Sequence, residues 1–131
     1  ITKSVAEIYL KKRKKIILGD ISARIDWGFS RDCVEAEWLA LQQKKPNDYV
    51  ISTGKSYSVE DFLRMAFEYV DLNYKKYLRI DKSLIRPTKT STLVGDILKK
   101  KKLLKWKPRT SIKQLVEMMV EHDLKSIKYN E

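Results

Sequence analysis

The segment ARIDWGFSRDCVEAEWLALQQ, residues 23–43, leads from a Trp-Gly turn into a predicted helix. Ser30 or Asp32 can cap the start of that helix, because their side-chain oxygens accept hydrogen bonds from free backbone N–H groups. Three apolar residues follow at helical spacing: Val34, Trp38 and Leu41. We expect these three side chains to form the buried face of the helix.

The flanking sequence adds a helix and three short strands. Residues 1–13 are predicted to be helical, since their apolar residues recur at helical spacing. IIL, residues 16–18, followed by Gly19, indicates a short buried strand and a turn. DYVISTG, residues 48–54, is a β-branched run closed by a glycine and predicts a buried, parallel strand. YLRID, residues 77–81, predicts a further short strand.

Two capping boxes indicate later helix starts. Ser58 with Asp61, and Ser111 with Gln114, have the spacing at which side chains and backbone N–H groups bind reciprocally. Asp96 can cap a short helix between them. The apolar faces expected for the two boxed helices are Phe62, Met65, Ala66 and Tyr69, and Ile112, Leu115, Val116, Met119 and Ile127.

The predicted elements are about five helices and three short strands, which is an α/β fold rich in helix. No long linker interrupts residues 1–131, so we expect a single domain. Three short strands are few for an independent sheet with helices on both faces. We therefore expect this chain to complete a sheet that begins elsewhere.

Composition limits the class of protein. The 131 residues are 43% hydrophobic and 34% charged, which suits one globular domain. No apolar run approaches the roughly 20 residues of a membrane span, and no signal peptide opens the sequence, so we expect a cytoplasmic protein. The first residue is Ile1 rather than Met, which suggests a fragment or a processed product. A single cysteine, Cys33, leaves no internal disulfide or cysteine-based metal cluster.

The net charge of +11 favours an anionic partner. Two basic runs, at residues 11–15 and 99–102, support a nucleic-acid-binding module as one alternative. Both runs fall at predicted helix ends, where a solvated face is the ordinary explanation, so nucleic acid is not the partner we expect first. A non-catalytic interaction domain is a further alternative.

No catalytic centre is recognisable in the chain. The four glycines, Gly19, Gly28, Gly54 and Gly95, are isolated and cannot form a phosphate-binding loop. The single histidine, His122, has no interpretable nucleophile or metal-ligand partner, and no tyrosine is followed by a lysine four residues later. We therefore expect no bound cofactor or metal on this chain alone.

Five segments, in order, resemble a known family: ITKSVAEIYL, LGDISARIDWGFSRDCVEAEWLALQQ, DYVISTGKSYSVEDFLRMAF, IRPTKTSTLVGD and LKWKPRTSIKQLVEMMVEHDL. Together they resemble the C-terminal half of the GDP-mannose 4,6-dehydratases, which are extended short-chain dehydrogenases/reductases. The resemblance covers nearly the whole chain. It implies an α/β fold that forms the C-terminal substrate-binding portion of such an enzyme.

The resemblance also implies an activity. Enzymes of this family bind NADP on an N-terminal Rossmann domain and convert GDP-mannose into GDP-4-keto-6-deoxymannose, a precursor of GDP-fucose. Their catalytic Tyr, Lys, Ser or Thr, and Glu lie N-terminal to the part that this sequence resembles. The C-terminal half holds the GDP-sugar and adds a strand to the Rossmann sheet, and the complete enzyme is expected to be a homo-oligomer.

Residues carried over from the family are mostly phosphate-binding candidates. Arg86, in IRP, matches an arginine that approaches the nucleotide diphosphate, which a guanidinium binds as a fork. The family arginine directly before DWG is replaced by Ile25, and Arg24 is a candidate substitute one residue earlier. For both arginines, the alternative is a solvated surface charge.

Other positions match or depart from the family pattern. Trp27 and Gly28 match, and Trp27 is expected to be a core residue or a pocket wall rather than a stacking partner for guanine. Lys89 replaces a glutamate near the nucleotide, and Asp20 replaces an asparagine, so both are candidate substrate contacts. These departures leave open a related GDP-sugar, such as a GDP-heptose, or an inactive homologue.

Overall fold

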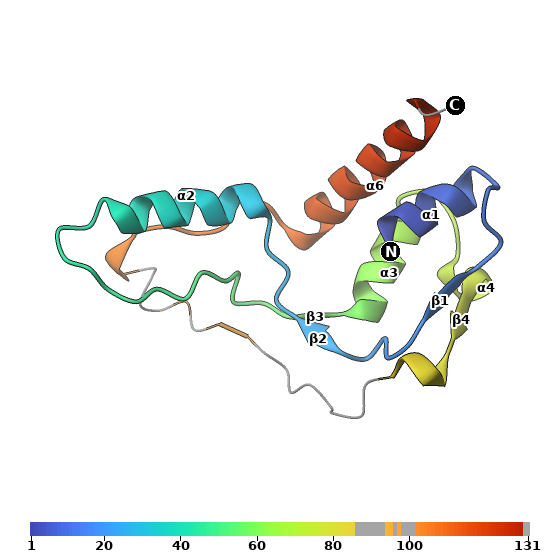
Figure 1. The fold of residues 1–131 in the computed structure, drawn as a ribbon, viewed down its shortest axis with the longest axis horizontal. Helices are drawn as coiled ribbons and strands as arrows, with labels where there is room; N and C mark the ends of the chain where they lie inside the picture. Colours follow the sequence, from blue (N-terminus) through green and yellow to red (C-terminus); the bar gives the residue numbers. More distant parts are fainter. Residues whose placement is uncertain (86–93, 96, 98–101, 130–131) are drawn as a thin grey trace.

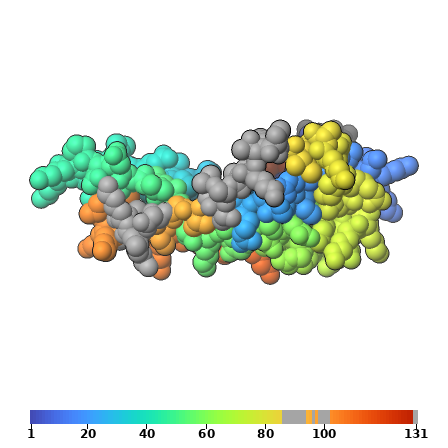
Figure 2. Space-filling model, turned by 90° about the horizontal axis from the view of Figure 1, so that it is seen from below, coloured from blue at the N-terminus to red at the C-terminus, as the bar shows by residue number. Residues whose placement is uncertain are grey.

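The computed structural model describes residues 1–85, 94–95, 97 and 102–129. Figure 1 shows an elongated arrangement in which α1, α3 and α6 pack together at one end and α2 extends toward the other. In the space-filling view, residues around α2 form the end opposite the N-terminal segment (Figure 2). Within the described ranges, no helix is long and apolar enough to cross a membrane.

Three helices form the main core. They are α1 (Thr2–Tyr9), α3 (Val59–Glu68) and α6 (Ile112–Tyr129). The fully buried side chains between them include Val5, Leu63, Phe67, Val116 and Val120. The apolar periodicity predicted these helices because one face of each is covered.

Details of the three helices differ from expectation. The predicted helix over residues 1–13 ends at Tyr9, and Lys11 has a left-handed φ of 59° that terminates it. The basic run 11–15 is therefore an exposed segment that follows the helix. Tyr69 and Met119, expected on buried faces, are each 41% exposed because they lie at the edges of the packed surface.

Both predicted capping boxes are confirmed. The Asp61 N–H donates to Ser58 Oγ at 2.9 Å, and the Ser58 N–H donates to Asp61 Oδ2 at 3.0 Å. At the start of α6, the Ser111 N–H donates to Gln114 Oε1 at 2.8 Å, and the Gln114 N–H donates to Ser111 Oγ at 3.3 Å. These bonds satisfy N–H groups that a helix start otherwise leaves unpaired. The helix expected after Asp96 starts outside the described residues.

Two small sheets connect the helices. Strand β1 (Ile16–Leu18) pairs in parallel with β4 (Leu78–Ile80), which confirms the strands predicted near these positions. Strand β2 (Arg24–Ile25) pairs antiparallel with β3 (Tyr57–Ser58), and this pair was not predicted. The short helix α4 (Tyr74–Tyr77) and the 3₁₀ helix η1 (Lys82–Leu84) flank β4.

The prediction of a strand at residues 48–54 is wrong, because this segment is irregular in the structure. A strand needs a neighbouring backbone for its hydrogen bonds. Here the N–H groups of Thr53 and Gly54 donate instead to the carboxylate of Asp26. Earlier in the segment, Tyr49 and Ile51 are partly buried against a second, smaller core.

The expected buried face of α2 (Ser30–Leu41) is also wrong. Val34, Trp38 and Leu41 are 60%, 59% and 81% exposed. The covered face contains Ala36, which packs with Leu104 and Trp106 in the smaller core. Helical periodicity identified an apolar face correctly but could not tell which of two faces is covered. Trp106 is buried, whereas Trp38 is not a core residue.

The expected cap of α2 differs as well. The N-cap position is Phe29, and its side chain makes no capping bond. Ser30 is the first helical residue. Asp32 lies in the first turn and is only 7% exposed, and its carboxylate is used elsewhere.

Candidate functional site

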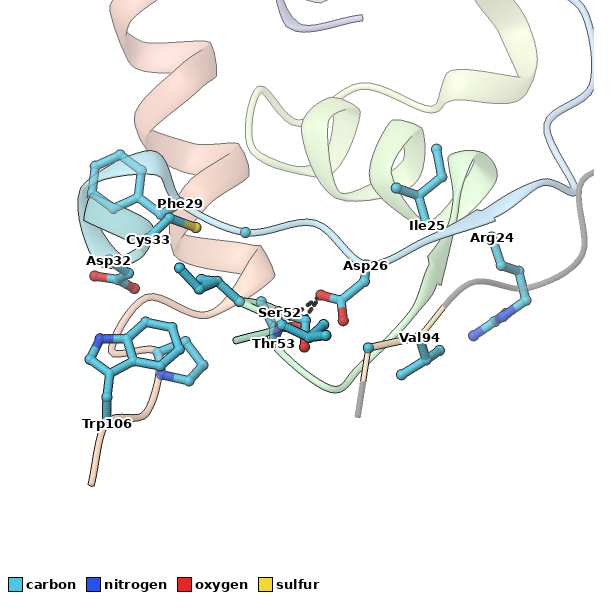
Figure 3. A pocket seen from close by; sticks show the side chains of 15 residues that line it. Arg24, Ile25, Asp26, Phe29, Asp32, Cys33, Ser52, Thr53, Val94 and Trp106 are labelled. Carbon is cyan, nitrogen blue, oxygen red and sulfur yellow. Dashed lines mark hydrogen bonds between the residues drawn. The ribbon is translucent and has the colours of Figure 1, made fainter. Parts of the chain in front are cut away.

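A pocket of about 510 Å³ lies where β2, the start of α2 and residues 50–53 meet. Figure 3 shows its lining side chains, which come from segments far apart in the sequence. Its walls are largely apolar, and the apolar lining includes Ile25, Phe29, Val50, Ile51, Val94 and Trp106. A concave, mostly apolar pocket with a few polar groups is typical of small-molecule sites.

Asp26 joins the two sides of this pocket. Its Oδ1 accepts the Thr53 N–H at 2.9 Å, and its Oδ2 accepts the Gly54 N–H at 3.0 Å. The Thr53 hydroxyl also donates to Oδ1. Figure 3 shows the Asp26 carboxylate directed at Thr53. The carboxylate thus holds residues 53–54 against the segment that follows β2.

Gly54 is required by this arrangement. Its φ is +76°, in the left-handed region that residues with a Cβ rarely adopt. A Cβ at this position would lie 2.9 Å from the Ile97 side chain. Sequence reasoning did not single out Asp26, because no local pattern connects it with Thr53, 27 positions later; its position in the DWG motif was the available signal.

Arg24 lies on β2 at the exposed rim of the pocket. Its Nη2 donates to the Ser56 carbonyl at 2.7 Å, and its Nε donates to Ser56 Oγ at 3.2 Å. Its Nη1 makes no hydrogen bond to the residues that the structure describes. Arg24 and Ile25 point to opposite sides of β2 (Figure 3). The Arg24 guanidinium therefore lies on the other side of the strand from the Ile25 side chain.

Trp27 lies between the main core and a second pocket. Its ring centroid is 4.8 Å from that of Phe62, and it lines a cavity of about 220 Å³ together with Lys55 and Arg109. The Trp27 Nε1–H is buried and has no hydrogen-bond partner among the described residues. Trp27 thus contacts both the core and a pocket.

The structure describes one of the three other predicted contacts, Asp20, and does not place it at either pocket. Asp20 is exposed before β2, where its Oδ1 accepts the Ser22 N–H at 2.8 Å and the Ser22 hydroxyl at 2.6 Å, and it lines neither pocket. Arg86 and Lys89 lie outside the described residues. Of the five predicted site residues, the structure therefore places Arg24 and Trp27 at pockets.

Asp32 lines the larger pocket and fixes the chain before α6. Its Oδ2 accepts the Thr110 N–H at 2.8 Å and the Arg109 N–H at 3.0 Å. Burial alone raises the pKa of Asp32, but the hydrogen bonds from Thr110 and Arg109 outweigh it and lower this pKa below its ordinary value of 3.8. The ionised carboxylate therefore stabilises the folded chain.

Replacing Asp32 with asparagine should lower the free energy of unfolding by about 1–3 kcal/mol at pH 7. The pKa of Asp32 is lower in the folded state than in the unfolded state. Its charge therefore stabilises the fold fully at a pH above the unfolded-state pKa, and this stabilisation is lost as the pH falls through the folded-state pKa. Urea unfolding should therefore show that the unchanged chain and Asp32→Asn differ less in free energy of unfolding near pH 3 than at neutral pH. Asp48→Asn, at an exposed position, is the matched control. An equal effect of both substitutions would contradict the role of Asp32.

Comparison with known proteins identifies the family. Residues 1–119 match the family model described as GDP-mannose 4,6 dehydratase. The chain belongs to this family. GDP-mannose 4,6 dehydratase 1 of Arabidopsis thaliana is 47% identical over 128 residues, which are 98% of this chain and 36% of that protein. GDP-mannose 4,6 dehydratase of Homo sapiens is 35% identical over an alignment of 147 positions, which covers 99% of this chain and 40% of that protein.

These dehydratase relatives are much longer than the chain. The chain spans little more than a third of their length. The family resemblance inferred from five sequence segments is confirmed, and so is the expectation that the chain matches only part of such an enzyme.

Solved structures show the same fold at low sequence identity. The structure of RMD from Pseudomonas aeruginosa complexed with NADPH has a TM-score of 0.86 and 15% identity, over 95% of this chain and 41% of that chain. UDP-glucose 4-epimerase from Thermotoga maritima with UDP-glucose has a TM-score of 0.74 and 20% identity, over 94% of this chain and 38% of that chain. The expected fold, the C-terminal portion of an extended short-chain dehydrogenase/reductase, is confirmed.

The described part of this dehydratase-family chain contains no glycine-rich loop and no cluster of metal-binding side chains. Gly28 and Gly95 line the larger pocket but belong to no glycine-rich loop. Among the described residues, no group of three His, Cys, Asp or Glu side chains could hold a metal ion. His122 is exposed on α6, and Cys33 lines the larger pocket.

Proposed function

We propose that this chain is the GDP-sugar-binding part of a GDP-mannose 4,6-dehydratase, a lyase that forms GDP-4-keto-6-deoxymannose. The observation that carries this proposal is the match of residues 1–119 to the dehydratase family. The complete enzyme is a cytoplasmic homo-oligomer that uses NADP. This chain has no glycine-rich loop, so NADP would bind the part of the enzyme outside it and would supply the hydride chemistry there.

The proposed role of Arg24 is to contact the diphosphate of the nucleotide sugar. Ser56 holds the guanidinium through Nε and Nη2, so its orientation is fixed before a ligand arrives. Nη1 has no hydrogen-bond partner among the described residues, so at the pocket rim it can donate charge-assisted hydrogen bonds to a phosphate oxygen. Arg86 supplies the second cation, and Lys89, Asp20 and Trp27 are further candidate contacts. The pocket wall beside Arg24 is largely apolar, so a nucleotide sugar bound against it would displace water and strengthen these bonds.

A chimaera tests this role in a complete enzyme. The aligned 98% of this chain would replace the matching region of the Arabidopsis relative, to which it is 47% identical over 128 residues. We expect the chimaera to convert GDP-mannose, and Arg24→Ala to raise KM about tenfold or more, since a charged hydrogen bond to phosphate is lost. Steady-state kinetics with GDP-mannose measures both effects.

Arg31→Ala is the matched control, because Arg31 is exposed on α2 and does not line the pocket. An unchanged KM for Arg24→Ala would exclude the diphosphate contact. A chimaera that folds but turns over a GDP-heptose and not GDP-mannose would correct the substrate.

A further inference from the structure

The smaller cavity, of about 220 Å³, lies between β3 and residues 108–112, the segment that leads into α6. We call it the α6 cavity. Two basic side chains, Lys55 and Arg109, line it, and none of the described residues in its lining is acidic. Pockets for drug-sized ligands are larger, at roughly 300–1,000 Å³. The α6 cavity therefore suits a small ligand with negative charge.

The backbone of Lys55 is fixed beside the cavity. Its N–H donates to Thr53 Oγ1 at 3.3 Å, and its carbonyl accepts the Thr53 hydroxyl at 3.2 Å. Among the described residues, the Lys55 ammonium forms no ion pair. Its positive charge is thus placed at the cavity without a carboxylate to balance it.

Arg109 is held from two directions. Its backbone N–H donates to Asp32 Oδ2 at 3.0 Å, and its Nη2 donates to Glu35 Oε1 at 2.6 Å. The other guanidinium nitrogens make no hydrogen bond to residues that the structure describes. Because a guanidinium has five N–H donors, Arg109 can keep its pair with Glu35 and still bind an anion.

The carboxylates near the α6 cavity are engaged and do not line it. Asp26 accepts the N–H groups of residues 53 and 54, and Asp32 accepts those of residues 109 and 110. Glu35 pairs with Arg109. An anion in the cavity would therefore meet two cationic side chains without a carboxylate in the lining.

Two uncharged donors also belong to the lining. The Tyr57 hydroxyl makes no hydrogen bond within the described part of the chain. The Trp27 ring lines the cavity, and its Nε1–H is buried without a partner among the described residues. Such donors favour a ligand that carries several acceptor oxygens.

We propose that the α6 cavity binds a phosphate dianion, either the free ion or the phosphoryl end of a small metabolite. A phosphate group carries nearly two negative charges at neutral pH, which match Lys55 and Arg109. Ammonium and guanidinium groups bind its oxygens through charge-assisted hydrogen bonds. A single carboxylate would balance only one of the two cations.

This site goes beyond the proposed function. Arg24, the proposed diphosphate contact, lines the larger pocket and not the α6 cavity. Thr53 lines both, and Asp26 holds its backbone. An anion in the α6 cavity would therefore lie next to a segment that forms one wall of the larger pocket.

Calorimetric titration of the 131-residue chain with inorganic phosphate tests the proposal. At constant ionic strength we expect saturable binding with a dissociation constant of about 1 mM or lower. Lys55→Gln and Arg109→Gln should each weaken binding about tenfold or more, because a charge-assisted hydrogen bond is lost. Absence of saturable binding to the unchanged chain would overturn the proposal.

Lys107→Gln is the matched control, because it removes one positive charge at an exposed position that does not line the α6 cavity. It should weaken phosphate binding by less than about twofold, since exposed charges are screened. An equal loss for Lys107→Gln and Lys55→Gln would show attraction by net charge alone and would overturn the site.

Arg24→Ala separates this site from the proposed function. It should leave phosphate binding to the 131-residue chain nearly unchanged. If Arg24→Ala abolishes that binding and Lys55→Gln does not, the phosphate binds at the proposed diphosphate contact and the α6 cavity is excluded. If Lys55→Gln weakens phosphate binding while Arg24→Ala leaves the KM of the chimaera unchanged, the α6 site is supported and the diphosphate contact fails.

NMR of the unchanged chain locates the phosphate without any substitution. Phosphate should shift the backbone amide resonances of residues 53–57 and 109–112 more than those of Arg24 and Ile25, and the reverse pattern would overturn the proposal. Methyl phosphate distinguishes the two sources, because comparable binding indicates a phosphoryl end and loss of binding indicates the free ion. Acetate that binds as tightly as phosphate would contradict a site for a dianion.

Discussion

Replacing Phe67 with alanine should lower the free energy of unfolding by about 3–5 kcal/mol, the usual cost of removing a buried ring. Phe67 is 0% exposed in the main core, and its ring stacks on Tyr77 with centroids 5.6 Å apart. Domains of this size are stable by only about 5–15 kcal/mol, so much of the stability would be lost. Urea unfolding followed by circular dichroism measures the change.

Met118→Ala is the control for this substitution, because Met118 is 41% exposed on α6. It should change the free energy of unfolding by no more than about 0.5 kcal/mol. A cost below about 1 kcal/mol for Phe67→Ala would mean that α3 does not pack as the structure shows.

Replacing Asp26 with alanine should lower the free energy of unfolding by about 2–4 kcal/mol, because charged hydrogen bonds are lost and partly buried donors remain unpaired. The lost bonds are those from the N–H groups of Thr53 and Gly54 and from the Thr53 hydroxyl. Residues 53–54 would no longer be held against the segment after β2. We therefore also expect a higher KM for GDP-mannose in the chimaera.

Asp26→Asn separates geometry from charge. Asparagine keeps one acceptor oxygen, so it should retain part of the contact to Thr53 and cost less than alanine. From wild type through asparagine to alanine, the free energy of unfolding should fall stepwise and the KM should rise stepwise. If both substitutions have the effect of Asp48→Asn, an exposed control, the carboxylate does not organise the pocket.

Elements with local determinants could be predicted from the sequence. The start of α3 follows from Ser58 and Asp61, and that of α6 from Ser111 and Gln114, because a capping box involves residues three positions apart. The β1 segment was recognisable because it is a short apolar run followed by a glycine. In each case the neighbouring residues carry the information.

Features that depend on distant partners could not be predicted in the same way. The segment 48–54 has the composition of a strand, but its backbone donors bind Asp26, more than 20 positions earlier. Helix α2 has two apolar faces, and the positions of Leu104 and Trp106, more than 60 residues later, decide which face is covered. Arg24 and Trp27 entered through the family resemblance, since no spacing rule connects either residue with a pocket.

The contact between α1 and α6 has a consequence for synthesis of the protein. Val5 and Ile8 in α1 belong to the same buried cluster as Val116 and Val120 in α6, and Figure 1 shows the two helices side by side. During translation, the apolar face of α1 emerges more than 100 residues before the helix that covers it. Contacts between such distant positions form late and reduce the folding rate. Until they form, the nascent chain exposes an apolar surface that is prone to aggregation. Ribosome-bound chains that stop before α6 should therefore depend on chaperones.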